Sequence, residues 1–222
     1  RSAVKKVAIG LPVYNGEEFL AEAIESIVGQ TFGDFELIIS DNASTDRTQE
    51  ICLRYATQDS RIRYIRQPVN IGAIPNFNFV TQVTQSEYFK WAAHDDVLAP
   101  TYLERCVAVL DANPSVVVAA PGTLLIDDVG APLRYSAERN ESIDRGGIAW
   151  PAVPEPNGDL SSPNVAARFE AVVLHTNLCV EVFGLIRRSA LDRCLPQGAY
   201  LGSDKVLIAK FSLLGQFWLG TE

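Results

Sequence analysis

Asp95 and Asp96 are the residues of this sequence whose types and spacing most clearly suggest chemistry. They come directly after His94, where the strand-like segment around Trp91 ends. Adjacent carboxylates repel each other and are costly unless water, a cation or hydrogen-bond donors satisfy them, so a hard divalent ion is a natural partner. Taken alone, the pair fits a turn before Pro100 at least as well.

A second carboxylate, Asp41, follows another strand-like segment. In the same stretch Asp46 is the better candidate for capping the next helix, because Gln49 stands three residues later. That leaves Asp41, which could accept the ring N–H of uracil or thymine and so select a pyrimidine base. An ordinary turn acid explains Asp41 equally well.

The first strand-like segment ends in residues 11–17, LPVYNGE. Tyr14 could stack on a base, although core packing or entry into the next helix accounts for the segment without a ligand. The sequence contains neither a dinucleotide-binding glycine fingerprint nor a P-loop, so a nucleotide would have to be bound in another way.

A predicted alternation of strands and helices positions these segments. Hydrophobic patterning predicts a parallel α/β fold, because strands at 7–11, 35–40, 61–66 and 87–92 alternate with helices at 17–28, 46–55, 74–83 and 101–110. The carboxyl ends of parallel strands meet at one edge of a sheet. The three segments are therefore expected to lie together.

The second half of the sequence is less regular. We expect strands at 116–120 and 123–126, a turn at 127–131, and a long surface loop over 134–163 that is rich in Gly, Pro and Ser. A helix at 165–174, a strand at 178–186 and a helix at 204–214 follow. Asp204 opens the last helix, where an N-cap would explain it, and where the helix N-terminus also favours an ionised carboxylate.

Composition excludes several classes of protein. The 222 residues are 47% hydrophobic, which is enough to bury the core of one domain. The net charge of −8 and the scattered Lys and Arg residues argue against a nucleic-acid partner. An acidic protein can still bind a diphosphate when a divalent cation stands between them. No apolar run approaches the roughly 18 residues of a membrane-spanning helix, so no transmembrane segment is predicted.

The cysteines bear on the compartment. Four separated cysteines without a CxxC pair favour buried, reduced thiols in a cytoplasmic protein, which could also lie peripherally on the inner face of a membrane. The start at Arg1 and the absence of Met indicate a fragment, and a segment beyond Glu222 could complete the site.

Together the three strand ends resemble family 2 of the glycosyltransferases, inverting enzymes with the GT-A fold. The first strand of that family ends in Pro-x-Tyr-Asn, matched by residues 12–15, with an acid near Glu17. The second ends in Asp followed by Ser-Thr-Asp, matched by Asp41 and residues 44–46. A later Asn-x-Gly is matched by residues 70–72, and the acidic metal motif by residues 94–96. Order and spacing agree over about the first 110 residues, which is far more specific than any single motif.

The resemblance implies a Rossmann-like half over residues 1–110 that binds a nucleoside-diphosphate sugar, on a mixed sheet with helices on both faces. Asp41 favours UDP or dTDP as the donor nucleotide. Asp95 would face the ribose or diphosphate, and Asp96 with Asp95 would hold a Mn or Mg ion. His94 departs from the usual Asp-x-Asp, which puts the metal geometry in question. The other implied donor-binding residues are Pro12, Val13, Tyr14, Asn15, Glu17, Asp41, Asn70 and Gly72.

In the same family the second half, here residues 111–222 of a single domain, binds the acceptor and supplies the catalytic base. Asp204 matches the base, although Ser203 replaces the acid that usually precedes it. The acceptor could be carbohydrate, lipid-linked or protein, in polysaccharide or glycoconjugate synthesis. Two alternatives stay open: a non-catalytic module that binds nucleotide sugars or glycans on the same fold, and a less favoured nucleotidyltransferase.

Overall fold

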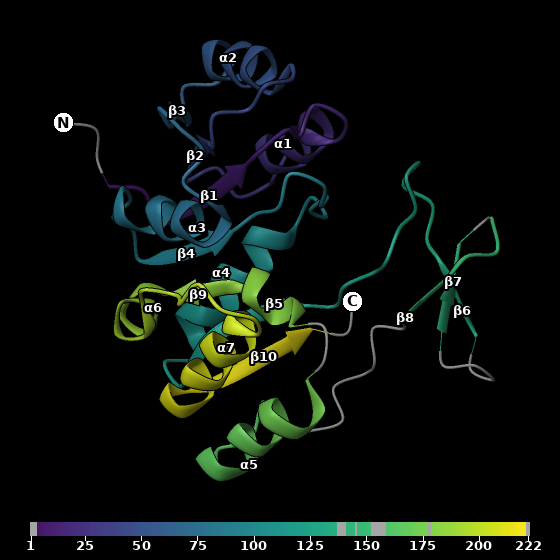
Figure 1. The fold of residues 1–222 in the computed structure, drawn as a ribbon. Coiled ribbons are helices and arrows are strands. Elements are labelled where there is room, and N and C mark those ends of the chain that lie inside the picture. The colour runs from purple at the N-terminus through teal and green to yellow at the C-terminus, as the bar shows by residue number, and fades with distance from the viewer. Residues whose placement is uncertain (1–3, 137–140, 145, 152–158, 177–178, 221–222) are drawn as a thin grey trace.

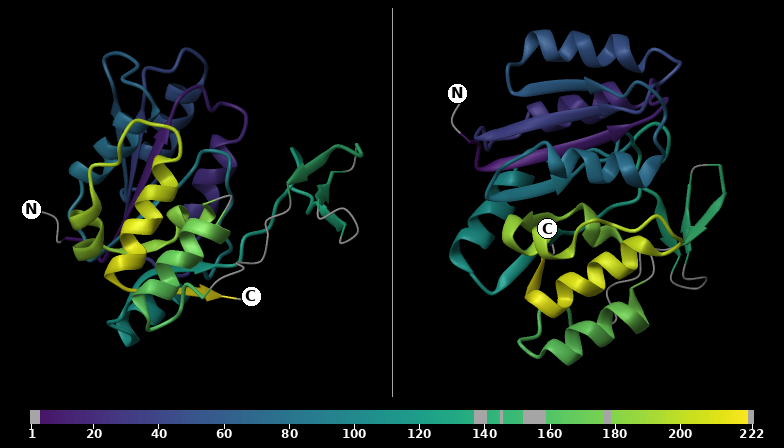
Figure 2. Two further views of the ribbon diagram at one scale, coloured as in Figure 1. Left: turned by 60° about the horizontal axis from the view of Figure 1, so that its bottom comes forward. Right: turned by 60° about the vertical axis from the view of Figure 1, so that its left-hand side comes forward.

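The computed structural model of the chain describes residues 4–136, 141–144, 146–151, 159–176 and 179–220. Its centre is a sheet of seven strands in the order β10-β5-β9-β4-β1-β2-β3, covered by helices on both faces (Figures 1 and 2). The strands are β1 Val7–Val13, β2 Phe35–Asp41, β3 Ile62–Arg66, β4 Tyr88–Trp91, β5 Val116–Pro121, β9 Leu185–Arg187 and β10 Gln216–Gly220. The helices are α1 Leu20–Val28, α2 Thr48–Gln58, α3 Ala73–Gln82, α4 Tyr102–Ala112, α5 Val165–Glu170, α6 Arg188–Cys194 and α7 Ser203–Leu214.

Strand β1 shows why the first half folds as the sequence predicts. All seven of its residues are buried, as expected of a strand with helices on both faces. Its odd-numbered residues pack with α1, α2 and α4, whereas Ala8 belongs to the core formed with α3, α6 and α7. Gly10 lets α3 approach, because a Cβ at that position would lie 2.6 Å from Cγ2 of Val80. Burial of each Ile or Leu in these cores contributes about 1.5–3 kcal/mol.

The direction of the strands decides where functional side chains gather. β1, β2, β3 and β4 run parallel, β9 is antiparallel to both β4 and β5, and β10 is parallel to β5. All strands of this sheet except β9 therefore end at one edge, and β9 begins there. Since α7 leads into the start of β10 at the opposite edge, the first turn of α7 also lies at this carboxyl edge. The predicted mixed α/β architecture is confirmed.

The segment 123–126 was expected to be a strand, and this prediction is wrong. Ile126 forms only an isolated bridge with Pro132, and Leu133 N donates to Leu125 O at 2.9 Å. The chain reverses in a tight turn at residues 127–130, in which Gly130 has φ 78°. The turn follows so soon that a longer β-ladder cannot form.

The expectation of a long surface loop over 134–163 is also wrong in part. Strands β6 Arg134–Ser136, β7 Glu141–Ile143 and β8 Ala149–Pro151 form a separate antiparallel sheet, which stands away from the main body in Figure 1. The turn before β8 is closed by Asp144, whose carboxylate accepts from Ile148 N. Strands of three residues carry too little hydrophobic alternation to be recognised from the sequence. Residues 137–140, 145 and 152–158 lie outside the described part of the chain.

The prediction of a strand over 178–186 is wrong as well. Its described part is a 3₁₀ turn, η2 (Val180–Phe183), followed by the short β9. Cys179 has φ 53°, in the left-handed region, which stops an extended strand from forming there. The expected helix at 165–174 is present as α5 with a π-helical continuation, Ala171–His175, whereas β10 was not predicted. Within the described residues, no helix is long and apolar enough to cross a membrane.

Candidate active site

Asn15 joins the two loops that follow β1 and β2. Its backbone N–H donates to Ser44 Oγ at 2.9 Å, and its side-chain Oδ1 accepts from Thr45 N at 2.8 Å. Asn15 has φ 51°, a left-handed conformation that Asn tolerates better than most residues. Asn15 therefore fixes the shape of the edge above β1, whether or not it also contacts a ligand.

Glu17 makes a second, reciprocal connection between the same loops. Its N–H donates to Asp46 Oδ2 and its Oε2 accepts from Arg47 N, both at 3.0 Å. Asp46 also accepts from Thr48 N, the first residue of α2. The N-cap position is Arg47, however, so the predicted capping box of Asp46 with Gln49 is not formed. Hydrogen bonds to the carboxylate help to lower the pKa of Asp46 against the opposing effect of burial, which is the largest single influence.

Tyr14 is the residue of the first loop that remains open to a ligand. Its side chain is 46% exposed, whereas Pro12 and Val13 are buried. A half-exposed ring on a loop held in place by neighbouring hydrogen bonds can stack on a planar group at little entropic cost.

Asp41 lies inside the protein, beneath the loop that follows β2. Its Oδ1 accepts from Ser44 N at 2.8 Å, and its Oδ2 accepts from Tyr64 Oη at 2.7 Å and from Arg66 at 2.6 Å. The side chain has no exposed surface. Burial and the bond to Asp41 raise the pKa of Tyr64 well above its usual value. The carboxylate is thus committed to internal donors, and direct contact of Asp41 with a base stays a prediction.

Asn42, which the sequence did not single out, holds the predicted Asn70–Gly72 turn. Its Nδ2 donates to Asn70 Oδ1 at 2.9 Å, and its Oδ1 accepts from Ile71 N at 2.8 Å. Gly72 has φ 90°, which explains the glycine in this turn. The signal for Asn42 was its place directly after Asp41 at a strand end.

The acidic pair lies at the end of β4, with both residues exposed. Although Asp96 is open to water, the protein around it removes part of its hydration, which raises its pKa, and Asp95 adds repulsion in the same direction. Lys90 and His94 oppose the shift. Two acids whose charges disfavour each other form a place where a cation would be stabilising.

His94 packs against the first loop. A Cβ on Gly16 would lie 2.8 Å from the His94 ring and 2.7 Å from Val13 Cγ2. His94 Nδ1 is 4.0 Å from Asp95 Oδ1, at the outer limit of an ion pair. The glycine therefore makes room for the His94 imidazole beside the first loop.

The residues present fit a metal that arrives together with a diphosphate. Within the described part of the chain, no group of three His, Cys, Asp or Glu residues could hold an ion by itself. Mg²⁺ sites of this type use one or two carboxylates and complete their coordination with substrate phosphates and water. Asp95 and Asp96 supply such a pair.

Asp204 lies half-buried in the first turn of α7, where its Oδ1 accepts from Lys205 N at 2.8 Å. The preceding Ser203 is buried, and its Oγ accepts from Gln197 Nε2 at 3.1 Å. Asp204 also lies near Cys179. Burial and, second, the negative charge of Asp204 raise the pKa of the Cys179 thiol to about 11. The sequence did not reveal this neighbour, since 24 residues without a matching motif lie between the two.

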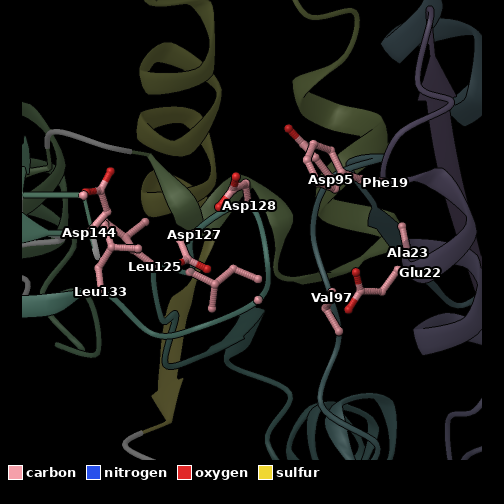
Figure 3. A pocket seen from close by; sticks show the side chains of 13 residues that line it. Phe19, Glu22, Ala23, Asp95, Val97, Leu125, Asp127, Asp128, Leu133 and Asp144 are labelled. Atoms are coloured by element: carbon pink, nitrogen blue, oxygen red, sulfur yellow. The ribbon is translucent and has the colours of Figure 1, made fainter. Parts of the chain in front are cut away.

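A cleft of about 810 Å³ opens beside the acidic pair (Figure 3). One wall comes from α1 with Asp95 and Val97, and the other from residues 125–133 and the turn of the small sheet. Asp95 is the one predicted site residue in its lining, since Asp96 and Asp204 are not part of it. The cleft thus adjoins the predicted donor site without reaching the predicted base.

Comparisons with other sequences agree with the resemblance. Residues 8–194 match the family model described as Glycosyl transferase family 2. A Bacillus subtilis protein named as a glycosyltransferase, EpsE, is 34% identical over 152 residues, which are 68% of this chain and 50% of that protein. The glycosyltransferase GlyG of Streptococcus pneumoniae is 33% identical over 98 residues, 44% of this chain and 33% of its own length. The chain therefore matches about half the length of the Bacillus relative and about a third of the length of the Streptococcus relative.

Solved structures share the architecture. Residues 1–349 of S. aureus TarS superpose with a TM-score of 0.70 and 17% identity, covering 98% of this chain and 58% of that one. The mannosyltransferase PcManGT from Pyrobaculum calidifontis, in complex with GDP-Man and Mn²⁺, gives 0.65 and 15% identity over all of this chain and 55% of that one. At such identities the likeness concerns the fold alone, and it confirms the predicted GT-A fold.

Proposed function

Because the chain belongs to Glycosyl transferase family 2, we propose that it is the catalytic domain of an inverting glycosyltransferase. It moves a sugar from a nucleoside-diphosphate sugar to a hydroxyl group of a carbohydrate, lipid-linked or protein acceptor. We place this reaction in the synthesis of a cell-surface polysaccharide or glycoconjugate. Structures of S. aureus TarS with UDP and with UDP-GlcNAc make UDP the first donor nucleotide to test. The GDP-Man complex of PcManGT makes GDP the second.

One observation carries the proposal: the acidic pair and Asp204 lie at the same edge of the sheet. β4 delivers Asp95 and Asp96 to the carboxyl edge, and α7 begins at that edge with Asp204 in its first turn. A carboxylate pair suited to a diphosphate-bound ion thus faces the same region as a carboxylate suited to act as a base. Neither feature would be sufficient alone.

In the proposed reaction Asp204 accepts the proton of the acceptor hydroxyl as that oxygen forms a bond to the anomeric carbon. The bond from that carbon to the donor diphosphate breaks on the opposite side, so the configuration inverts and a nucleoside diphosphate leaves. The dipole of α7 favours the ionised form of Asp204 at the helix N-terminus. A divalent ion held by Asp95 and Asp96 would neutralise charge on the leaving diphosphate.

The donor base would lie over the loops that follow β1 and β2. Tyr14 supplies an exposed ring for stacking, with Pro12 and Val13 beneath it. We assign Asn15, Glu17, Asn70 and Gly72 to shaping this surface, because each of them takes part in a hydrogen bond between two loops. Asp41 would act in the same way, through the loop above it.

The test is a thermal-shift series with UDP, dTDP, GDP, CDP and ADP, each with and without Mn²⁺. A ligand at 100 times its dissociation constant stabilises a protein by about 2.7 kcal/mol, which is readily measured. We expect one of UDP, dTDP or GDP to stabilise the protein more with Mn²⁺, and Asp96→Asn to abolish the Mn²⁺-dependent part. Asp192→Asn removes an exposed acid on α6 that pairs with Arg188, and serves as the matched control.

Activity is then assayed as release of nucleoside diphosphate from the matching sugar donors. Slow hydrolysis by the wild-type protein in Mn²⁺ would support an enzyme over a binding module. Release of pyrophosphate from a nucleoside triphosphate and a sugar 1-phosphate, without release of nucleoside diphosphate from the sugar donor, would overturn the proposal in favour of a nucleotidyltransferase.

A further inference from the structure

We propose that Lys90 is a positioning residue for the transfer reaction, whose ammonium group ties the η2 turn of the base-bearing half to the end of β4. The inference rests on the proposed function, since it concerns the relative placement of the acidic pair and Asp204. Neither the motifs nor the family resemblance assigns a role to Lys90.

The geometry around Lys90 brings two halves of the chain together. Its side chain is only 2% exposed, and its Nζ donates to the carbonyl oxygen of Phe183 in η2. Tyr102 Oη of α4 donates to the same oxygen at 3.0 Å, and the Lys90 ammonium lies 4.6 Å from the centroid of the Tyr102 ring. One carbonyl of the second half is thus held by two side chains of the first.

The ammonium is costly where it lies. Within the described residues Lys90 makes no ion pair, and the carboxylate of Asp96 influences its pKa only through space. Taking an unpaired cation out of water is unfavourable, and an apolar residue of similar length would avoid that cost. Neither packing nor an ion pair therefore explains a lysine here, whereas its bond to Phe183 gives it a role.

Lys90 stands between the two groups that must cooperate. Five residues after it the chain reaches Asp95, and the η2 turn that it holds begins next to Cys179, the neighbour of Asp204. Fixing the Phe183 carbonyl consequently fixes the base-bearing segment relative to the acidic pair. A misplacement of about 1 Å between reacting groups can cost on the order of a hundredfold in rate.

Of the described groups around the Lys90 ammonium, none other than the ammonium itself changes its charge between pH 7 and pH 9. These groups are Tyr102 and Cys106 from α4, Asp96 from the loop after β4, and the Phe183 carbonyl from η2. Burial raises the pKa of Tyr102 well above its usual value and that of Cys106 to about 12, so both stay neutral through pH 9. Burial lowers the pKa of Lys90 to about 8.

The experiment compares Lys90→Met with Tyr102→Phe. The second variant removes the hydrogen bond from the Tyr102 hydroxyl to the Phe183 carbonyl but keeps the Lys90 ammonium. For each variant three quantities are measured: affinity for UDP with Mn²⁺ by calorimetry, kcat of sugar transfer or donor hydrolysis at saturating donor, and the midpoint of thermal unfolding. GDP with Mn²⁺ is used if the ligand series selects it.

We expect Lys90→Met to lower kcat at least tenfold, to leave nucleotide affinity within about threefold, and to raise the unfolding midpoint. Tyr102→Phe removes only the neutral one of the two hydrogen bonds to the Phe183 carbonyl, and should therefore lower kcat less than Lys90→Met does. Lower kcat together with higher thermal stability separates positioning from a merely structural role, which would lower both. Unchanged kcat in Lys90→Met, or an equal loss of kcat and nucleotide affinity, would overturn the proposal.

If Lys90→Met does not fold, the pH profile of wild-type kcat decides. The positioning role predicts a partial fall as pH rises through about 8, where the ammonium becomes a neutral amine that donates a weaker hydrogen bond to the Phe183 carbonyl. A flat profile to pH 9.5 contradicts it. Absence of any transfer or hydrolysis by the wild-type protein would count against the proposed function itself, which keeps the two failures distinct.

Discussion

Arg66 forms an ion pair with Asp41, with 2.6 Å between Arg66 Nη1 and Asp41 Oδ2, and the Asp41 side chain is entirely buried. The two residues are register partners on β2 and β3, and Arg66 also donates to Ser44 O at 2.8 Å. The pair therefore clamps the loop that follows β2 from below. This relationship turns Asp41 from a candidate reader of the base into a support for the surface on which the base would lie.

Asp41→Asn tests that assignment. An amide cannot accept all the bonds that the buried carboxylate accepts from Ser44 and Tyr64, so unfolding in urea is expected to show a loss of about 2 kcal/mol. UDP affinity should fall only together with this loss of loop structure. Asp59→Asn, which breaks an ion pair with Arg61 remote from the strand ends, is the control. Unchanged stability with a large loss of UDP affinity would instead favour direct contact with the base.

Gly16→Ala probes the contact between the first loop and the acidic motif. The new Cβ would lie 2.7 Å from Val13 Cγ2 and 2.8 Å from the His94 ring, so something must move. Overpacking of this kind costs about 1–3 kcal/mol. Displacement of His94 should also weaken Mn²⁺-dependent nucleotide binding. Gly33→Ala meets nothing within 4 Å and should change neither stability nor binding by a comparable amount.

Asp204→Asn addresses the proposed base. We expect kcat to fall at least about a hundredfold while the affinity for nucleotide with Mn²⁺ stays the same, because general-base action contributes that much to a rate. The amide can still accept from Lys205 N, so the start of α7 should be preserved. Near-normal transfer by this variant would remove Asp204 from the mechanism and leave it as a helix-capping residue.

The first half could be read from the sequence because each of its elements carries a local signal. β1 is a continuous apolar run, and Leu20, Ile24 and Ile27 repeat at helical spacing on α1, so pattern and burial agree. The meeting of the strand ends followed from parallel topology alone. Sequence reasoning could also propose Asp95, Asp96 and Asp204, since family motifs mark them, although their roles remain to be tested.

The second half escaped prediction where long-range contacts decide the structure. β9 has only three residues and exists because β4 and β5 lie on either side of it. Gly184 before it allows this fit, since a Cβ there would lie 3.0 Å from Ala119 O. Lys90 was missed for the same reason: within β4 it looks like a solvent-facing lysine, and only the distant Phe183 carbonyl reveals a buried one.

The burial of Lys90 also predicts how stability depends on pH. Its pKa is about 8 in the folded protein against 10.5 in the unfolded chain, so between these values the unfolded chain binds more protons. The contribution of Lys90 to the free energy of unfolding should therefore rise with pH across this window, and its penalty should be complete below pH 8. At roughly 1.4 kcal/mol per pKa unit, that penalty is about 3 kcal/mol.

Urea unfolding of the wild-type protein and of Lys90→Met at pH 7 and at pH 9.5 measures this penalty directly. The variant should be the more stable at pH 7, and the difference should shrink at pH 9.5. Lys6→Met supplies the control: the hydrogen bond that the half-buried Lys6 donates to Asp111 raises the pKa of Lys6, so this variant should be less stable than the wild type by the same amount at both pH values. An advantage of Lys90→Met that stays constant between the two pH values would mean that the ammonium does not titrate in this window.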